Sequence, residues 1–345
     1  MLSTKLSLAE CEKLMAEDHG DLNLSRSKVT SLPTGLTVKG DLHLWGSKIE
    51  ELPKGLTVAG SLDLGYTEIE YLPDDLSVGS DLNLHSSKIK SLPKRLSVGG
   101  DLNLGNTEIK SLPDDLFVGG DLVLSYTAIK SLPDNLSVGK NLYLQDSEIK
   151  KLPRGLNVGG SLDLQWTEIE SLLDDLSVGG NLYLQGSKIK KLPKGLTVGG
   201  DLNLSRTEIE SLPDDLSVGK NLYLQDSEIK KLPRGLNVSG SLDLQWTEIE
   251  SLLDDLSVGG NLYLQGSKIK KLPQRLNVGG YLDLRDTKVK ELPNGLHVGG
   301  DLDLRGTGIE SIPDNLSVGC DLLLHDSHVS LVPNDTSIGG EIKWN

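Results

Sequence analysis

The sequence contains little cysteine and no long apolar run, and each shortage excludes a class of protein. Its two cysteines, Cys11 and Cys320, lie near opposite ends of the chain. We therefore expect no disulfide between them and no disulfide-stabilised extracellular domain. No run approaches the roughly 18 apolar residues that cross a bilayer, and no basic-then-apolar leader stands at the N-terminus. We expect no membrane span and no Sec export.

Positive charge and histidine are also scarce. The chain has 35 Lys and Arg against 50 Asp and Glu, a net charge of −15. No basic stripe is present to neutralise phosphates, so nucleic-acid binding is not expected. The histidines are scattered, and His325 and His328 beside Asp326 lack a second ligand pair, so we interpret them as surface residues. We predict a non-catalytic protein without a cofactor or metal.

What the chain has in abundance is repetition. Residues 21–340 fall into sixteen consecutive blocks of twenty, without insertion or deletion, of the form x-L-x-L-x-x-[ST]-x-[IV]-x-x-L-P-x-x-L-x-V-G-G. A fixed period of this size with leucines at these offsets is typical of a solenoid, in which each coil stacks only on its neighbours. We predict one elongated domain, and count positions 1 to 20 of a coil from Asp21 in the first block.

Proline, glycine and the apolar residues each keep fixed positions. All 14 prolines stand at position 13, where only Leu173 and Leu253 replace them. Proline lacks an N–H and fixes φ, which predicts an extended segment on the outer side of each coil. Glycine at position 19 or 20 of every coil indicates a tight corner before a strand. Positions 2, 4, 9, 12, 16 and 18 are apolar and predict six inward side chains per coil, a continuous narrow core.

The run L-x-L-x-x-[ST]-x-I-x-x-L-P-x-x-L resembles the twenty-residue repeats of the bacterial LPX-type leucine-rich-repeat proteins. The resemblance implies a β-rich solenoid with a parallel sheet on its inner face, extended outer segments and a protein-binding role. Effector ubiquitin ligases of this type carry a cysteine-bearing catalytic domain after the repeats, for which no residues remain here. A right-handed β-helix with twenty-residue coils is the alternative fold.

The chain departs from that family at position 7. Where the family carries asparagine, this chain carries Ser or Thr in all sixteen coils, from Ser27 to Ser327. A hydroxyl can still bond to backbone, so we expect a Ser/Thr ladder that bonds to the neighbouring coil.

Both ends of the repeat array carry candidate caps. Residues 1–20 predict an N-terminal capping helix: Ser7 to Glu10 matches a capping box, and Leu8, Cys11, Leu14 and Met15 fall on one helical face, which we expect to cover the first coil. Residues 341–345 begin a further strand and stop, and we expect Trp344 to cover the last coil as a C-terminal cap remnant.

Charged residues alternate in sign from coil to coil. Glu168 and Glu170 are followed twenty residues later by Lys188 and Lys190, and the outer pairs such as Asp174 and Asp175 alternate in the same way. Stacked coils make equal positions neighbours, so we predict ladders of opposite charge that stabilise the stack. Asp and Asn recur at positions 1 and 3, but without a repeating Gly-x-Asp motif we expect no calcium there.

Aromatic residues gather on one predicted face. In the strand x-L-x-L-x the leucines point inward, so positions 1, 3 and 5 face the inner surface of the array. Exposed aromatics interleaved with amides and carboxylates favour a binding surface, although cross-strand packing that stabilises the sheet is an alternative. The predicted ligand-binding residues are Trp45, Tyr66, Tyr126, Tyr143, Gln145, Asp163, Trp166, Tyr183, Gln185, Tyr223, Gln225, Asp243, Trp246, Tyr263 and Gln265.

Part of this face occurs twice. Residues 141–200 recur at 221–280 with four differences, none of them on the inner strand. Recent slippage in a repeat gene explains this without selection. The alternative is a repetitive ligand, or two copies of one ligand, held by avidity.

Two functions remain open at this stage. We predict a scaffold that binds a protein partner, in the manner of a bacterial effector that occupies a host protein. The alternative is a glycan- or repetitive-polymer-binding protein that stacks sugars on the aromatic inner surface. For location we expect the cytoplasm, or a host cell reached without a Sec leader.

Overall fold

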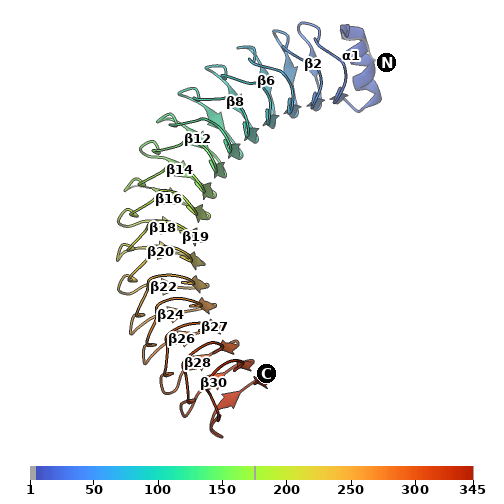
Figure 1. Cartoon of the computed structure of the whole chain (residues 1–345). Coiled ribbons are helices and arrows are strands. Elements are labelled where there is room, and N and C mark those ends of the chain that lie inside the picture. Colours follow the sequence, from blue (N-terminus) through green and yellow to red (C-terminus); the bar gives the residue numbers. More distant parts are fainter. Residues whose placement is uncertain (1–4, 175, 345) are drawn as a thin grey trace. The chain divides into compact units, whose positions relative to one another are not determined.

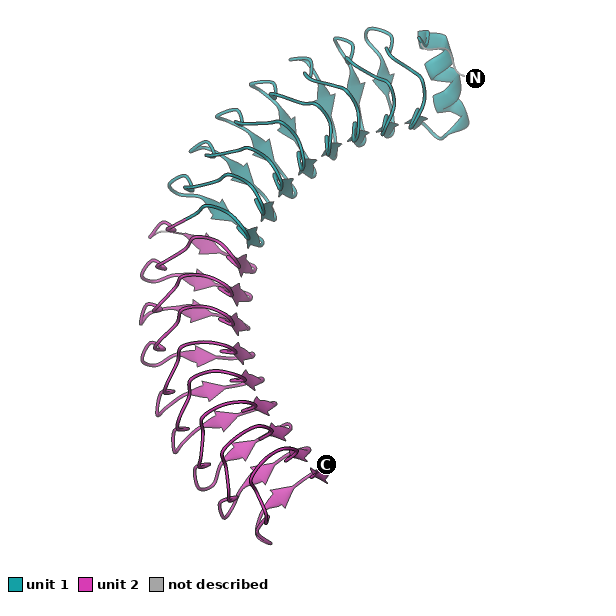
Figure 2. Cartoon of the chain, viewed as in Figure 1, with its two compact units in different colours: residues 1–169 teal, residues 170–345 magenta. Residues whose placement is uncertain are grey.

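The computed structural model describes residues 5–174 and 176–344 (Figure 1). Asp175 of the predicted charge pattern, residues 1–4 of the predicted N-terminal cap and Asn345 of the C-terminal cap remnant lie outside the described residues. The chain divides into two compact units, residues 1–169 and 170–345 (Figure 2). Each unit is a stack of the predicted twenty-residue coils.

Each coil of the first unit contributes two short parallel strands. The first strand occupies positions 2 and 3, and the second strand occupies positions 17 and 18. Coils pair position for position, so Leu22 pairs with Leu42 and Asn23 with His43. The first strands are β1 (Leu22–Asn23), β3 (Leu42–His43), β5 (Leu62–Asp63), β7 (Leu82–Asn83), β9 (Leu102–Asn103), β11 (Leu122–Val123), β13 (Leu142–Tyr143) and β15 (Leu162–Asp163). The second strands are β2 (Thr37–Val38), β4 (Thr57–Val58), β6 (Ser77–Val78), β8 (Ser97–Val98), β10 (Phe117–Val118), β12 (Ser137–Val138) and β14 (Asn157–Val158).

The second unit repeats this plan. Within each unit taken by itself, the first strands line the concave side (Figure 2). The first strands here are β17 (Leu182–Tyr183), β19 (Leu202–Asn203), β21 (Leu222–Tyr223), β23 (Leu242–Asp243), β25 (Leu262–Tyr263), β27 (Leu282–Asp283), β29 (Leu302–Asp303), β31 (Leu322–Leu323) and β33 (Ile342–Lys343). The second strands are β16 (Ser177–Val178), β18 (Thr197–Val198), β20 (Ser217–Val218), β22 (Asn237–Val238), β24 (Ser257–Val258), β26 (Asn277–Val278), β28 (His297–Val298), β30 (Ser317–Val318) and β32 (Ser337–Ile338).

The core consists of the six predicted apolar columns. In the coil that begins at Asp101, Leu102, Leu104 and Ile109 are fully buried and Leu116 is almost so. Successive residues of a strand point to opposite faces, so positions 2 and 4 both enter the interior. The prediction of six inward positions is confirmed.

The second strands were not predicted, because Val-Gly-Gly was interpreted only as a corner. Glycine at position 19 follows from this second sheet. A Cβ on Gly119 would lie 2.2 Å from the carbonyl oxygen of Gly99 in the preceding coil. This close approach favours glycine, and where Ser239 takes the same position its hydroxyl donates to the Gly219 carbonyl at 2.6 Å.

Position 7 does not form the predicted ladder between coils. The Thr67 hydroxyl donates to the Leu64 carbonyl, 2.7 Å away in its own coil, and Thr207 does the same to Leu204 at 2.6 Å. A tight turn follows position 4 and brings its carbonyl back within reach, so the local bond forms instead. The prediction of a bond to the neighbouring coil was wrong.

The ladder between coils lies at position 1 instead. The Asp21 carboxylate accepts the Asp41 backbone N–H at 2.8 Å, and the Asn221 side-chain oxygen accepts the Ser241 N–H at 2.7 Å. The same bond recurs along both units, with a serine hydroxyl as acceptor in some coils. Asp and Asn at position 1 therefore bind the backbone of the next coil, which explains their recurrence.

The N-terminal cap forms as a helix, α1 (Leu8–Glu17). Ser7 and Glu10 make the predicted capping box, and Cys11 is buried as expected. Leu8, however, is 45% exposed, because it begins the helix and Leu6 takes the buried place beside the first coil. The prediction that Leu8 covers the first coil was wrong. No helix among residues 5–174 and 176–344 is long and apolar enough to cross a membrane.

The C-terminal end of the array is partly exposed. Trp344 is 41% exposed and Ile342, in β33, is 36% exposed. Trp344 follows the last described strand, and no further coil packs over its ring within the described residues. That Trp344 covers the last coil stays a prediction.

Candidate functional site on the first sheet

Position 3 carries a side chain that shapes its own coil. Wherever it is Asp or Asn, its oxygen can accept the backbone N–H of position 5, as Asn103 does from Gly105 at 3.0 Å and Asn203 from Ser205 at 3.0 Å. This is an Asx turn, a local device that holds the chain as it leaves the first strand.

Asp163 and Asp243, both predicted to bind ligand, make this turn. Their carboxylates accept the N–H groups of Gln165 and Gln245 at 3.0 Å and are 7% and 8% exposed. Burial raises the pKa of both carboxyl groups, and the hydrogen bonds from the glutamines offset part of that rise. The oxygens of both side chains are therefore already engaged within their own coils. No group of three or more His, Cys, Asp and Glu that could hold a metal occurs among the described residues.

Tyrosine replaces the Asx residue in four coils. Tyr143, Tyr183, Tyr223 and Tyr263 are half-buried. The Tyr263 hydroxyl accepts a hydrogen bond from the Asn261 side chain at 2.7 Å, and Tyr183 accepts one from Asn181 at 2.6 Å. Tyrosine has no oxygen near its own backbone, so these coils give up the Asx turn. A large, partly exposed ring takes its place on the concave side.

The predicted glutamines at position 5 lie beside these tyrosines. Gln185 accepts a hydrogen bond from Asn203 at 3.3 Å, and Gln265 donates one to Asp286 at 3.4 Å. The side-chain oxygens of Gln145 and Gln225 are buried and have no hydrogen-bond partner. A buried acceptor without a donor costs free energy, which a ligand N–H or O–H could recover.

Four exposed aromatic rings stand at position 6, beyond the end of the first strand. Tyr66, Tyr126, Trp166 and Trp246 are 54%, 59%, 46% and 54% exposed. All four hold left-handed backbone, with φ of 56°, 58°, 56° and 55°. A bulky residue is rare in that region, which favours Gly, Asn and Asp. Other coils do place those residues there, for example Gly266.

Two of the predicted tryptophans lie against glycine of the next coil. A Cβ on Gly266 would meet the Trp246 ring at 2.2 Å, and one on Gly65 would meet Trp45 at 2.9 Å. Glycine therefore leaves room for each ring to lie close to the neighbouring backbone.

A stack of rings near the N-terminus includes two residues that were not predicted. The Arg26 guanidinium lies 4.5 Å from the Trp45 ring centroid. Trp45 meets Tyr66 edge-on at 5.4 Å, and Tyr66 meets His85 at 5.5 Å. The four residues come from four successive coils, and a search for aromatic letters alone could not include Arg26 or His85.

A buried ionic network near the C-terminus was also missed. Asp283 and Asp303 are fully buried at position 3, and Arg285 and Arg305 each contact the carboxylate of their own coil at 2.6 Å. The Tyr281 hydroxyl donates to Asp303 at 2.8 Å. The sequence signal for this pairing was Asp at position 3 followed by Arg at position 5.

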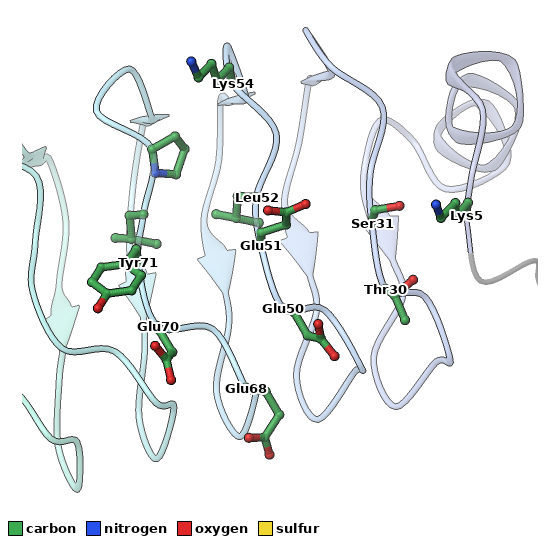
Figure 3. Close-up of a pocket in the computed structure, with 12 residues that line it drawn as sticks. Lys5, Thr30, Ser31, Glu50, Glu51, Leu52, Lys54, Glu68, Glu70 and Tyr71 are labelled. Atoms are coloured by element: carbon green, nitrogen blue, oxygen red, sulfur yellow. The ribbon is translucent and has the colours of Figure 1, made fainter.

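The flanks of the coils carry the predicted charge ladders. Lys90 pairs with Glu70 at 2.7 Å and Lys270 with Glu250 at 2.9 Å, in agreement with the predicted alternation. Among the described residues, no ion pair occurs at positions 14 and 15. One flank of the first unit also holds an open hollow of about 1030 Å³ whose lining includes Glu50, Glu51, Glu68, Glu70, Tyr71, Lys5 and Lys54 (Figure 3).

Comparison with solved structures identifies the fold. YopM of Yersinia pestis, whose structure is described as that of a leucine-rich effector protein, aligns with a TM-score of 0.57 at 20% identity, over 97% of this chain and 92% of that one. The chain has a leucine-rich-repeat fold. A leucine-rich-repeat protein of Leptospira interrogans aligns with a TM-score of 0.55 at 21% identity, over 97% and 96% of the two chains.

A more distant leucine-rich-repeat structure is a complex. The Toll–Spätzle complex of Drosophila aligns with a TM-score of 0.52 at 17% identity, over 88% of this chain and 48% of that chain. Neither a protein-family model nor a curated protein matches the sequence. The predicted leucine-rich-repeat array is confirmed, and likeness at this level of identity establishes the fold alone.

Proposed function

We propose that this leucine-rich-repeat chain is a non-catalytic scaffold that binds a protein partner through the concave aromatic face. The observation that carries the proposal is the left-handed backbone at Trp166 and Trp246, with exposed rings. Holding a bulky residue there costs roughly 1–2 kcal/mol that glycine would not. The turn needs this backbone at position 6 but no bulky side chain there, so the exposed rings support a role in contact with a partner.

Trp and Tyr are also the residues that dominate protein interfaces, since they bury a large area at low entropy cost. The Toll–Spätzle complex is an example of a leucine-rich-repeat protein bound to a protein. A finer proposal is that the chain acts as a bacterial effector on a host protein. Its repeat pattern and its fold likeness to YopM, described as an effector, support that proposal.

The test replaces the tryptophans by the residue that the turn prefers. Trp166→Gly with Trp246→Gly should leave the free energy of unfolding within about 1 kcal/mol of the parent, because relief of the left-handed backbone offsets the lost ring contact. Partner binding should weaken by about 1–4 kcal/mol for each ring that is a hot spot. Both quantities follow from urea denaturation and from quantitative pull-down with host-cell lysate, with captured proteins identified by mass spectrometry.

Asn106→Gly is the matched control, because Asn106 holds the same left-handed backbone, with φ of 56°, but has no ring. It should leave capture unchanged. A double variant that captures the same proteins as the parent would contradict the proposal. Capture that survives protease treatment of the ligand but not glycosidase treatment would favour the glycan-binding alternative.

A further inference from the structure

The tyrosines of the second unit form a column with a regular spacing. The first strands pair so that Tyr183 faces Asn203, Asn203 faces Tyr223, Tyr223 faces Asp243, and Asp243 faces Tyr263. A tyrosine therefore occurs at position 3 of every second coil. The residues between the tyrosines, Asn203 and Asp243, have smaller side chains, and Asp243 is buried. Along the stacking axis, a projecting ring therefore alternates with a residue that projects less.

The spacing of this column selects one backbone conformation for a linear ligand. Strands of a parallel sheet lie about 4.8 Å apart, so tyrosines two coils apart repeat every ~9.6 Å. A polyproline II helix repeats every three residues, at about 3.1 Å per residue, or ~9.3 Å. An extended β-strand repeats every two residues at ~6.7 Å and falls out of register by the second ring.

We propose that Tyr183, Tyr223 and Tyr263 bind a basic, proline-rich segment in polyproline II conformation, laid along the stacking axis with every third residue against a tyrosine. The inference rests on the proposed function and names the kind of protein segment that is bound. Aromatic rings recognise such segments because the helix is already ordered, so little entropy is lost on binding.

The polar groups around the column fit this ligand. A polyproline II backbone makes no internal hydrogen bonds, so its carbonyls can accept from side-chain amides on the sheet, and its non-proline residues retain an N–H. The side-chain oxygen of Gln225 is buried without a donor, and it can accept that N–H once the side chain turns outward. The exposed Trp246 ring, close against Gly266, offers a further apolar contact at position 6 of the coil between Tyr223 and Tyr263.

Charge favours basic residues in the ligand. On positions 1, 3, 5 and 6 of residues 181–280, the coils of the column, carboxylates outnumber guanidinium groups. The carboxylates belong to Asp201, Asp226 and Asp243, and the one guanidinium group belongs to Arg206. The excess negative charge attracts Lys or Arg placed between prolines.

Fluorescence anisotropy tests the proposal with labelled synthetic peptides. The probe is a peptide of Lys-Pro-Pro triplets long enough to span the three tyrosines, and its control has Lys-Gly-Gly triplets, equal in charge but flexible. At roughly 0.15 M salt, where surface charges are partly screened, the proline peptide should bind at least about tenfold more tightly. Tyr223→Ala should weaken it by about tenfold. Tyr71→Ala, which removes an exposed tyrosine on a flank of the first unit, should not.

A register variant separates spacing from the mere presence of tyrosine. Deleting residues 201–220 removes the coil of Asn203 and places Tyr183 and Tyr223 on adjacent coils, while no tyrosine is lost. The proline peptide should then bind about tenfold more weakly. Deleting residues 101–120 removes a coil of the first unit, leaves the column intact and should not change binding. Circular dichroism confirms that both variants fold.

Four outcomes would overturn the inference. Equal binding of the proline and glycine peptides would show that the peptide binds through its charge and not through its polyproline II conformation. Failure of the proline peptide to bind the folded parent would contradict the proposed ligand. Unchanged binding after the 201–220 deletion would show that the spacing of the tyrosines does not matter. Binding of cello-oligosaccharide with neither peptide bound would assign the column to a glycan. If a Trp246-dependent protein partner is found while the proline peptide fails, the proposed function stands and this inference falls.

Discussion

At the scale of single residues, two aspartates at position 3 have pKa values shifted in opposite directions by their surroundings. Asp243 is buried with only amide donors around it, and burial raises its pKa above the usual 3.8. Burial alone would also raise the pKa of Asp303, but hydrogen bonds from Arg305 and Tyr281 outweigh it, and the pKa falls below 3.8.

These opposite shifts predict opposite effects of pH on stability. For Asp243 the folded state binds its proton more tightly than the unfolded state, so its contribution is full below pH 3.8 and is lost as pH rises through the raised pKa. For Asp303 the contribution is present above pH 3.8 and is lost as pH falls through the lowered pKa.

Substitution by asparagine separates the two cases. Asp243→Asn should keep or raise stability at pH 7, because asparagine still accepts the Gln245 N–H, as Asn203 accepts that of Ser205, without burying a charge. Asp303→Asn should cost about 1–3 kcal/mol at pH 7, since Arg305 loses its counter-ion but stays partly solvated. Urea denaturation from pH 3 to pH 7 measures both. Equal losses in the two variants would contradict the assignment.

At the scale of the coil, the repeat predicted the elements that depend on apolar burial. The period places Leu102, Leu104 and Ile109 in the core, and all three are buried. The features that were missed depend on local backbone geometry. Leucine at positions 2 and 4 does not reveal that the strand ends at position 3, nor that Trp246 at position 6 is left-handed. The hydroxyl of Thr67 could have bonded in either direction, and only the turn decides.

The candidate site was also predictable only in part, because the sequence does not show local backbone geometry. Aromatic residues at positions that the repeat does not dictate located Tyr263 on the first sheet and Trp246 just beyond the end of its strand. Asp163 was grouped with them because its side chain is polar. It is in fact buried and accepts a hydrogen bond from Gln165. The sequence could not separate a carboxylate that shapes a turn from one that faces solvent, because both stand at position 3.

Burial at position 4 makes a sharp prediction for one coil. Leu104→Asp places a carboxylate without a counter-ion at a site that is 0% exposed, and should cost at least about 4 kcal/mol or prevent folding. Leu331→Asp makes the same chemical change at a site that is 72% exposed, and should change stability by less than about 0.5 kcal/mol. Thermal denaturation followed by circular dichroism compares them. A similar loss in both would mean that the core is not where the six columns place it.

At the scale of the whole molecule, each described strand pairs with strands twenty residues away in the sequence. Leu122, for example, pairs with Leu102 on one side and Leu142 on the other. Stability in such an array is approximately a sum of coil and interface contributions. The array should therefore tolerate the loss of a whole coil but not of part of one.

Deletion of residues 101–120 tests this directly. The Asp101 N–H bonds to Asp81 and the Asp121 N–H bonds to Asp101, each at 2.8 Å, so after the deletion Asp121 can bond to Asp81 in the same geometry. Leu122 then stacks on Leu82, and the variant should unfold cooperatively with a stability close to that of the parent.

Deletion of residues 101–110 removes half as many residues but shifts the register. Ser111 then occupies position 1 of its coil and Asp114 occupies the inward position 4, where a leucine stood. Because a buried unpaired carboxylate is strongly destabilising, this shorter deletion should do more damage than the longer one. Circular dichroism and urea denaturation of the two variants decide between the alternatives. If the ten-residue deletion were the milder of the two, stacking of equal positions would not be what holds the coils together.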